Sequence, residues 1–247
     1  MTAPAQTTNI KPKEEGFFKS LFLAILFAVI IRSFLYEPFH IPSGSMKPNL
    51  LIGDYIFVSK YSYGYSRYSF PFGLPIFKGR ILNYFSQPKR GDIAVFRLPN
   101  NPEINYVKRI IGLPNDKIQI KEGVVFINDT PLKQTPDGTY QDLQTNKNLE
   151  KFSEQINPNQ YINILNQEKT DQDDTGVYIV PENHYFMMGD NRDNSQDSRF
   201  LQNVGYVPAE NLVGKVSLVF FSLDLDNFNF SNLSKIIRYK RMLVKPQ

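Results

Sequence analysis

Two serines in one short segment offer nucleophilic chemistry. Ser43 and Ser45 lie within residues 41–50, with a glycine between them and a proline on each side of the pair. Glycine lets another backbone approach closely, and the prolines favour a locally extended, rigid chain. A serine hydroxyl held in such a segment can attack a carbonyl when a general base lies beside it.

Lys108 is the best candidate for that base. Residues 104–111 alternate as a β-strand does, which places Lys108 on the same face as Tyr106 and Ile110, with Arg109 on the other. Burial disfavours the charged form of an amine and lowers its pKa, so a buried lysine can serve as a base near pH 7. The alternative is a lysine at a strand edge that extends to water. We expect Arg109 to be structural.

The composition excludes several other kinds of site. The chain has no cysteine, so it has no disulfide framework, zinc-thiolate site or cysteine nucleophile. Its two histidines, His40 and His184, are too few for a histidine-rich metal site, and we expect no metal and no cofactor. A Ser-His-Asp hydrolase that uses one of them remains an alternative.

The charge is mildly basic. The formal net charge is +4 and the pI about 9.0, with the basic residues scattered along the chain. This fits a protein beside an anionic lipid surface at least as well as one that binds nucleic acid, and no nucleic-acid module is visible.

The most apolar stretch lies near the start of the chain. Residues 21–31 are all apolar, between Lys19 and Arg32. A helix over residues 17–35 would be about 28 Å long, enough to cross a bilayer core. No small-x-small cleavage site follows, so an uncleaved anchor is favoured over a signal peptide or a buried core helix.

Basic residues set the expected orientation of this anchor. More lysines precede the apolar run than follow it closely, and the positive-inside rule then places the N-terminus in the cytoplasm. We predict a cytoplasmic tail at 1–16, one transmembrane helix at 17–36 and everything after it on the outer side.

The remainder predicts a mainly β protein. We assign the catalytic β-domain to residues 37–117 and 177–247. Residues 130–176 are polar, with few apolar positions, so we predict that 118–176 form a small inserted subdomain or an elaborated loop. Strands or hairpins are expected at 54–61, 93–98, 104–111, 118–129, 177–181, 184–190, 205–208 and 212–221.

Two segments have open interpretations. Residues 61–85 mix aromatic residues with Gly, Pro, Arg and Lys, and form either an ordinary loop or a surface that dips into lipid headgroups. Residues 235–245 are basic and apolar, and we interpret them as a surface or membrane-proximal end, because they are too short and too charged to span a bilayer.

Five motifs stand in the order found in the bacterial type I signal peptidases, which are membrane-bound leader peptidases, and the chain resembles this family. The resemblance covers most of residues 39–215 apart from the polar insert. The motifs are Ser-Gly-Ser-Met-x-Pro at 43–48, Gly-Asp at 53–54, Lys-Arg-Gly-Asp at 89–92, Tyr-x-Lys-Arg-x-x-Gly-x-Pro-x-Asp at 106–116 and Gly-Asp-Asn-Arg-Asp-Asn-Ser-x-Asp-Ser-Arg at 189–199.

The resemblance implies a Ser-Lys dyad, with Ser45 as nucleophile and Lys108 as general base. It further implies that the Ser43 hydroxyl helps the Ser45 backbone N–H to bind the oxyanion. Ser195 matches the residue that orients the lysine amine. Met46 is either membrane-facing or part of a pocket.

The last motif supplies residues that support the site. Asp197 and Arg199 match an ion pair that shapes it; the alternative is a structural salt bridge with no catalytic role. By the same resemblance, four further residues form the surrounding loop: Asp190, Asn191, Arg192 and Asp193.

For fold and substrate, the resemblance implies a largely antiparallel, barrel-like β-domain with the dyad in a groove. A secreted preprotein would lie extended there, with small residues at positions −1 and −3, and would lose its signal peptide at the outer face of the bacterial cytoplasmic membrane. The expected partners are therefore preproteins and the phospholipid membrane. This chain departs from the longest family members in having one predicted span and a compact insert.

Two rivals come from other classes. The self-cleaving repressors also use a Ser-Lys dyad, but they need a DNA-binding domain where this chain has its apolar stretch. A membrane-tethered β-domain that only binds partners would fit the architecture, but loss of Ser45 or Lys108 would be expected, and both are present.

Overall fold

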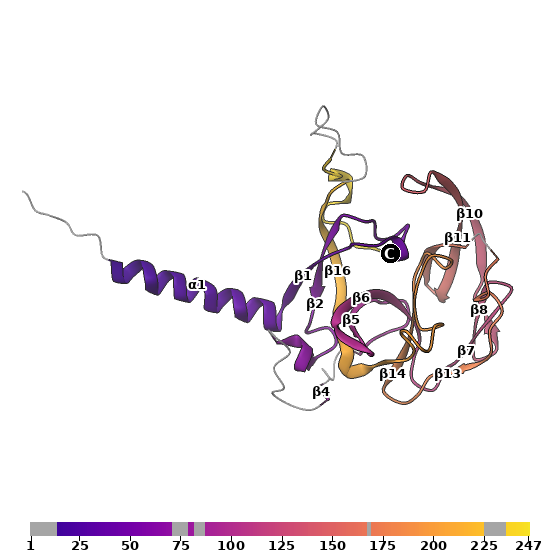
Figure 1. The fold of residues 1–247 in the computed structure, drawn as a ribbon, viewed down its shortest axis with the longest axis horizontal. Coiled ribbons are helices and arrows are strands. Elements are labelled where there is room, and N and C mark those ends of the chain that lie inside the picture. Colours follow the sequence, from indigo (N-terminus) through magenta and orange to yellow (C-terminus); the bar gives the residue numbers. More distant parts are fainter. Residues whose placement is uncertain (1–13, 71–78, 82–86, 167–168, 225–235) are drawn as a thin grey trace, which may run out of the picture.

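A single long helix projects from a body made of strands (Figure 1). The computed structural model describes residues 14–70, 79–81, 87–166, 169–224 and 236–247. The strand pairs within its sheets are all antiparallel, which confirms the prediction of a mainly β fold with antiparallel sheets and one N-terminal apolar helix.

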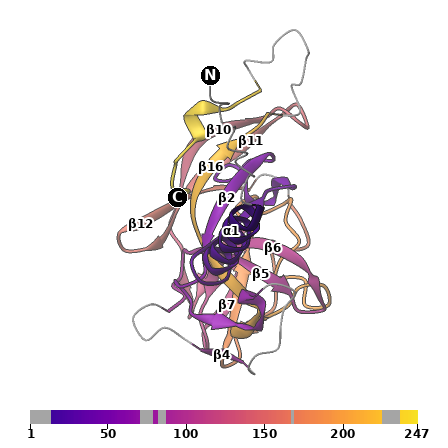
Figure 2. The same ribbon diagram turned by 90° about the vertical axis from the view of Figure 1, so that its left-hand side faces the viewer.

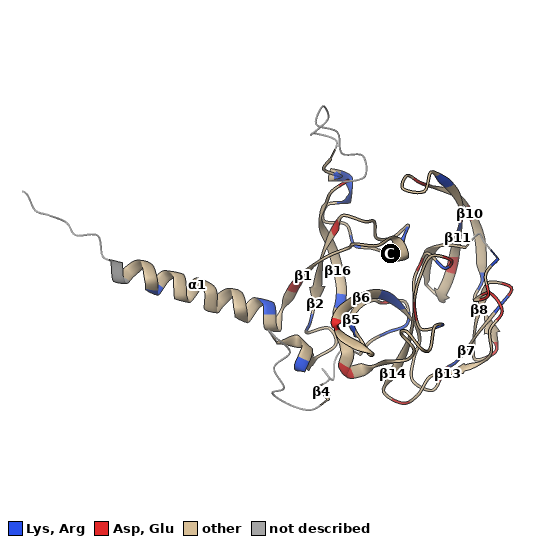
Figure 3. Ribbon diagram, viewed as in Figure 1, with Lys and Arg blue, Asp and Glu red and all other residues tan. Residues whose placement is uncertain are grey.

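Helix α1 runs from Glu14 to Phe34 and projects away from the body (Figure 1); Figure 2 shows it nearly along its axis. Its window Gly16–Phe34 has a mean hydropathy of 2.0 and is 6% buried. Charged residues are few along its length (Figure 3). A core helix would bury these side chains, so that alternative is wrong, and the exposed apolar surface suits a lipid environment.

The main sheet has seven strands in the order β1-β2-β16-β5-β6-β14-β15. Its longest members are β6 and β16. The order of the strands in the sheet places residues from distant parts of the chain side by side. The strands are β1 Tyr36–His40, β2 Asp54–Ser59, β5 Ile93–Leu98, β6 Asn101–Gly112, β14 His184–Met188, β15 Val207–Pro208 and β16 Leu212–Ser222.

Strand β6 begins earlier than expected. The expected strands 93–98 and 104–111 leave residues 99–103 between them, but β6 starts at Asn101 and includes Pro102. Leu98 pairs with Asn101, with an irregularity in register beside it, so the turn is tighter than the sequence suggested. Pro102 lies at the exposed beginning of the strand, where proline is tolerated in a sheet.

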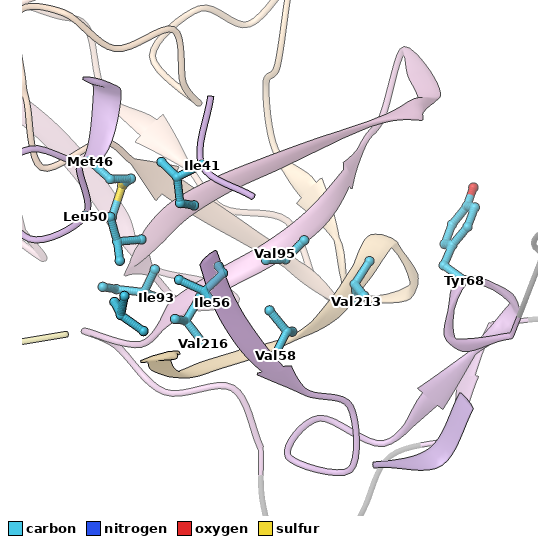
Figure 4. Close-up of a cluster of buried hydrophobic side chains, with 11 residues drawn as sticks. Ile41, Met46, Leu50, Ile56, Val58, Tyr68, Ile93, Val95, Val213 and Val216 are labelled. Atoms are coloured by element: carbon cyan, nitrogen blue, oxygen red, sulfur yellow. The ribbon is translucent and has the colours of Figure 1, made fainter. Parts of the chain in front are cut away.

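The segment that carries the two serines packs on the main sheet through three apolar side chains. Ile41, Met46 and Leu50 are buried in one cluster with side chains of the main sheet, among them Ile56 and Ile93 (Figure 4). Met46 is therefore a core residue and not membrane-facing. These anchors fix the short 3-10 turn η1, Gly44–Met46, against the sheet.

Residues 117–165, together with residues 178–179, form two further sheets, visible on the right of Figure 1. One has the order β13-β7-β8-β9 and the other the order β10-β11-β12. The strands are β7 Lys117–Lys121, β8 Val124–Ile127, β9 Thr130–Pro131, β10 Gln134–Asp142, β11 Lys147–Asn157, β12 Gln160–Leu165 and β13 Tyr178–Ile179.

The polar insert has an apolar underside. Ile162 and Ile164 of β12 are buried with Ile111 of β6 and Phe186 of β14 in one cluster. The insert thus shares a core with strands that carry the candidate site. The boundaries 118–176 assigned to it remain a prediction.

The aromatic segment is described in part. Strands β3, Tyr65–Ser66, and β4, Arg80–Ile81, form a two-stranded sheet, and the 3-10 turn η2, Arg67–Ser69, follows β3. Rings of this segment pack edge to face on Phe34 at the end of α1. Residues 71–78 and 82–86 lie outside the described residues, and membrane contact by this segment stays a prediction.

The Gly-Asp motif at 53–54 joins the C-terminal segment to the sheet. Asp54 is fully buried and accepts hydrogen bonds from Arg241 and from the Ser222 hydroxyl. Gly53 has φ +86°, and a Cβ there would lie 2.1 Å from the Leu223 carbonyl oxygen. A 3-10 turn near the end of the chain, η6, spans Tyr239–Arg241. Another 3-10 turn, η4, spans Ala209–Asn211.

The shared core makes a prediction for the insert. Ile164→Ala should lower the free energy of unfolding by about 2–5 kcal/mol, because it removes a fully buried side chain and leaves a cavity. Urea denaturation of the detergent-solubilised chain measures this. Tyr161→Ala, on the same strand but 54% exposed, is the control and should change stability by less than about 0.5 kcal/mol. Equal effects of the two changes would show that the insert does not share this core.

Candidate active site

The structure brings Ser45 and Lys108 into contact. The Lys108 Nζ atom donates a hydrogen bond of 2.5 Å to the Ser45 Oγ atom, although the two residues are 63 positions apart. Ser45 lies on η1 and Lys108 on β6, and both are buried. The amine points toward the hydroxyl because the period of the strand directs Lys108 to the face that η1 covers.

Burial controls the charge of Lys108. Desolvation lowers the pKa of Lys108 from 10.5 to about 8, while the carboxylates of Asp197 and Asp190 act in the opposite direction. In the described part of the chain, no carboxylate oxygen lies within 4.0 Å of the amine. The Tyr106 ring lies 5.5 Å from Nζ. A substantial fraction of the amine is therefore neutral near pH 8, as a base must be.

A second lysine lies next to Ser45 in the sequence but has another partner. The Lys47 amine is buried and donates to the Asp142 carboxylate at 2.6 Å and to the Gln144 side-chain oxygen at 2.8 Å. Sequence reasoning missed this pair, because Asp142 is 95 residues away in the polar insert. Of these two amines, Lys108 is thus the one hydrogen-bonded to the Ser45 hydroxyl.

Ser43 lies beside Ser45, with 3.4 Å between the two hydroxyl oxygens. It occupies the N-cap position of η1 and makes no side-chain capping bond. The first N–H groups of a helical turn have no partner inside the turn, which applies to Ser45. An exposed hydroxyl and an adjacent backbone N–H are the two donors that an oxyanion requires.

Asp197 accepts hydrogen bonds from Arg199, Ser195 and Gly189. The Arg199 guanidinium donates to both of its oxygens, at 2.8 and 2.9 Å, and the Ser195 hydroxyl and Gly189 N–H donate to Oδ2 at 2.8 and 3.0 Å. Burial alone would raise the pKa of Asp197, but Arg199 and Gly189 outweigh it and the pKa lies below its usual value. Asp197 is therefore ionised.

Ser195 contacts Asp197 and not the lysine amine in the described structure. Its position depends on Gly189, where a Cβ would lie 2.2 Å from the Ser195 Oγ atom and 2.5 Å from the Ser45 carbonyl oxygen. Glycine at 189 thus lets Ser195 and the Ser45 turn approach the same point. The lysine-orienting role of Ser195 remains a proposal.

The loop at 190–193 supports the turn that carries Ser45. The Asn191 backbone N–H donates to the Ser45 carbonyl at 3.1 Å, and its side chain donates to the Gly44 carbonyl at 3.2 Å. Asp190 is paired in a bidentate manner with Arg109, at 2.7 and 2.6 Å, with both side chains buried. Arg109 therefore has a structural partner, on the far side of β6 from Lys108.

The other two loop residues face the insert. Arg192 forms a buried ion pair with Glu154 of β11. Asp193 lines a cavity of about 250 Å³ together with Asn191 and residues of β11 and β12. Arg192 thus links the loop to β11, and Asp193 lies beside the same insert.

The histidines lie elsewhere. His184 Nδ1 contacts the Glu182 carbonyl oxygen, and His40 is an exposed residue of β1 that packs on Tyr55. Neither has a hydrogen bond to Ser45, so the geometry does not support a Ser-His-Asp arrangement. Within the described ranges, no three His, Asp or Glu side chains are grouped to hold a metal ion.

Comparisons with known proteins give the relatives of this chain. The family model described as "Signal peptidase, peptidase S26" matches residues 15–221. Signal peptidase I of Rickettsia typhi is 45% identical over 226 residues, covering 87% of this chain and 82% of the relative. That of Rickettsia canadensis is 44% identical over 226 residues, covering 87% and 83%. A crystal structure of a signal peptidase I from Enterococcus faecalis matches 53% of this chain and 98% of its own, with 26% identity and a TM-score of 0.33.

The depressed pKa of Lys108 can be measured directly. In a chain with 13Cε-labelled lysines, the Lys108 signal should titrate near pH 8, whereas exposed lysines titrate near 10.4. Lys108→Met identifies the signal by its absence. The unfolded chain binds more protons than the folded chain between pH 8 and 10.5, so stability should rise with pH in that window. A Lys108 signal that titrates above pH 10 would contradict the desolvated site.

Proposed function

The chain belongs to the signal peptidase family, peptidase S26, which removes signal peptides, and we propose that it does so with a Ser45–Lys108 dyad. The single observation that supports this assignment is the 2.5 Å hydrogen bond from the Lys108 amine to the Ser45 hydroxyl. A serine hydroxyl is a weak nucleophile until an adjacent base accepts its proton.

The reaction has two halves. The Ser45 oxygen attacks the scissile carbonyl while neutral Lys108 accepts the hydroxyl proton, and the tetrahedral oxyanion is stabilised by the Ser43 hydroxyl and the Ser45 N–H. Protonated Lys108 gives this proton to the leaving amine of the mature protein, which leaves the signal peptide as an ester on Ser45. Water then attacks the ester, Lys108 accepts a proton from it, and Ser45 regains one as the signal peptide departs.

One residue thus acts as both base and acid. A group with a pKa near the working pH is best suited to accept and return a proton, and the pKa of Lys108 is about 8. We assign Ser195 to orienting the amine, with Asp197 and Arg199 fixing Ser195. Asp190, Asn191, Arg192 and Asp193 would support these groups as the loop of the site.

The substrate and its place follow from the family. We propose that secreted preproteins lie extended beside the dyad and are cleaved after small-x-small sites, with backbone pairing giving affinity and shallow pockets giving specificity. The apolar helix α1 would anchor the chain in the phospholipid membrane as a single span. With its N-terminus in the cytoplasm, the β body would act at the outer face of the cytoplasmic membrane.

The dyad is tested by cleavage of a purified preprotein by the detergent-solubilised chain. Ser45→Ala and Lys108→Ala should each lower kcat by at least about 1000-fold, because each removes a group that the bond-breaking step needs. His184→Ala is the control and should retain activity. Cleavage that survives either substitution would assign the nucleophile or base elsewhere, and an inactive wild type would favour a binding module.

Ser43→Ala tests the oxyanion role separately. Loss of one oxyanion donor should lower kcat by about 100- to 1000-fold and leave KM nearly unchanged, because the hydroxyl acts on charge that develops only in the transition state. Ser43→Thr, which keeps a hydroxyl, should retain more activity than Ser43→Ala. A Ser43→Ala variant that raises KM with kcat unchanged would place Ser43 in substrate binding instead.

A further inference from the structure

The polar insert reaches the nucleophile through a buried ion pair. Lys47 lies two residues after Ser45, and Asp142 ends strand β10 at the tip of the β10–β11 hairpin. The side chains of the pair are 6% and 4% exposed. The aliphatic part of Lys47 lies along Gly44, where a Cβ would be 3.0 Å from the Lys47 Cε atom. The lysine thus passes across η1 before it meets the carboxylate.

The same insert is attached to the other loop of the site by its backbone. The Leu165 N–H of β12 donates to the Asp190 carbonyl at 2.9 Å, and the Arg192 N–H donates to the Leu165 carbonyl at 2.8 Å. The buried Arg192–Glu154 pair adds a side-chain link to β11. The insert therefore has a fixed position relative to the 190–193 loop.

The insert contacts the segment of the Ser45 turn through polar side chains. Cavities of about 250 and 220 Å³ are both lined by Asp142, the first with Asn191 and Leu165, the second with Leu51 and Tyr140. Open space therefore borders the hairpin tip where it faces this turn. Besides the ion pair, the Lys47 amine donates to the Gln144 side-chain oxygen at 2.8 Å, and the Asn49 side chain donates to the Asn163 carbonyl at 2.7 Å.

The negative charge of the Asp142 carboxylate favours a persistent contact with the Lys47 amine. Burial alone would raise the pKa of Asp142, but hydrogen bonds from Lys47 and from the Gln144 N–H outweigh this effect. The pKa of Asp142 therefore lies below its usual value, and the carboxylate is ionised at neutral pH. A buried ion pair of this kind contributes little net stability against an apolar pair of the same size, but it specifies one geometry.

We propose that the Lys47–Asp142 ion pair positions the nucleophile: it holds η1 against the insert so that the Ser45 hydroxyl stays within hydrogen-bond distance of the Lys108 amine. Lys47 and Asp142 are positioning residues, and the hairpin tip is the part of the insert that supplies this function. The inference rests on the proposed dyad. A three-residue turn has little rigidity of its own, and small displacements of reacting groups are costly to the rate.

A set of four variants tests this role with the full chain in detergent: Lys47→Met, Asp142→Leu, both together, and Lys47→Arg. Each single change leaves a buried charge without its partner and should lower both the melting temperature and kcat. The double variant has no unpaired charge and should regain the melting temperature. Its kcat should stay about 10- to 100-fold below wild type, with KM changed far less, because the link to η1 is still absent.

Two controls accompany the set. Lys47→Arg keeps a cation opposite Asp142 and should retain kcat within a few-fold of wild type. Lys151→Met removes a partly exposed ion pair with Asp137 on the same hairpin, at 2.8 Å, and should leave kcat and melting temperature unchanged.

The outcomes separate this inference from the proposed function. A double variant with the wild-type kcat would show that the pair only balances buried charge, and unchanged single variants would show that it does nothing for Ser45; either result overturns the inference. If a single variant does not fold, the double variant and Lys47→Arg decide. Failure of the folded wild type to cleave a preprotein would count against the proposed function itself.

Discussion

The burial of one amine is the constraint on which the site depends. A charged ammonium is costly to remove from water, so the fold that covers Lys108 also shifts it toward the neutral form, to a pKa of about 8. The same cover, formed by η1, brings the Ser45 hydroxyl to 2.5 Å. The contact and the chemistry therefore have a single cause, the packing of a short turn over the face of β6 that carries the lysine.

Buried ion pairs connect segments that are distant in the chain. Arg109–Asp190 ties β6 to the loop after β14, and Arg192–Glu154 ties that loop to the insert. Such pairs are costly to desolvate and add little net stability, so we interpret them as specifying a geometry. Both pairs involve the 190–193 loop, whose Asn191 donates hydrogen bonds to the Ser45 and Gly44 carbonyls, so these charges fix the loop that supports the Ser45 turn.

The sequence predicted what depends on local pattern. A nearly continuous apolar run gave strand 93–98 with its observed bounds, and period-two alternation placed Lys108 and Arg109 on opposite faces of β6. Residue types and motif order then suggested which groups belong together. The partners of Lys47 and Arg192 could not be predicted, because Asp142 and Glu154 lie in a polar stretch with no motif. The start of β6 at Asn101 was missed because a tight turn, set by tertiary pairing, allows Pro102 to begin a strand.

The arrangement of Asp197 explains how a lysine can be a base so close to a carboxylate. A carboxylate that accepted a hydrogen bond from Lys108 would favour the charged amine, which cannot accept a proton. Here the Asp197 oxygens already accept from Arg199, Ser195 and Gly189, and the guanidinium offsets the negative charge. Asp197 still raises the pKa of Lys108, but less than burial lowers it. On this view the Asp197–Arg199 pair is structural in its contacts and yet acts on the chemistry, because it keeps a buried carboxylate occupied by donors other than the amine.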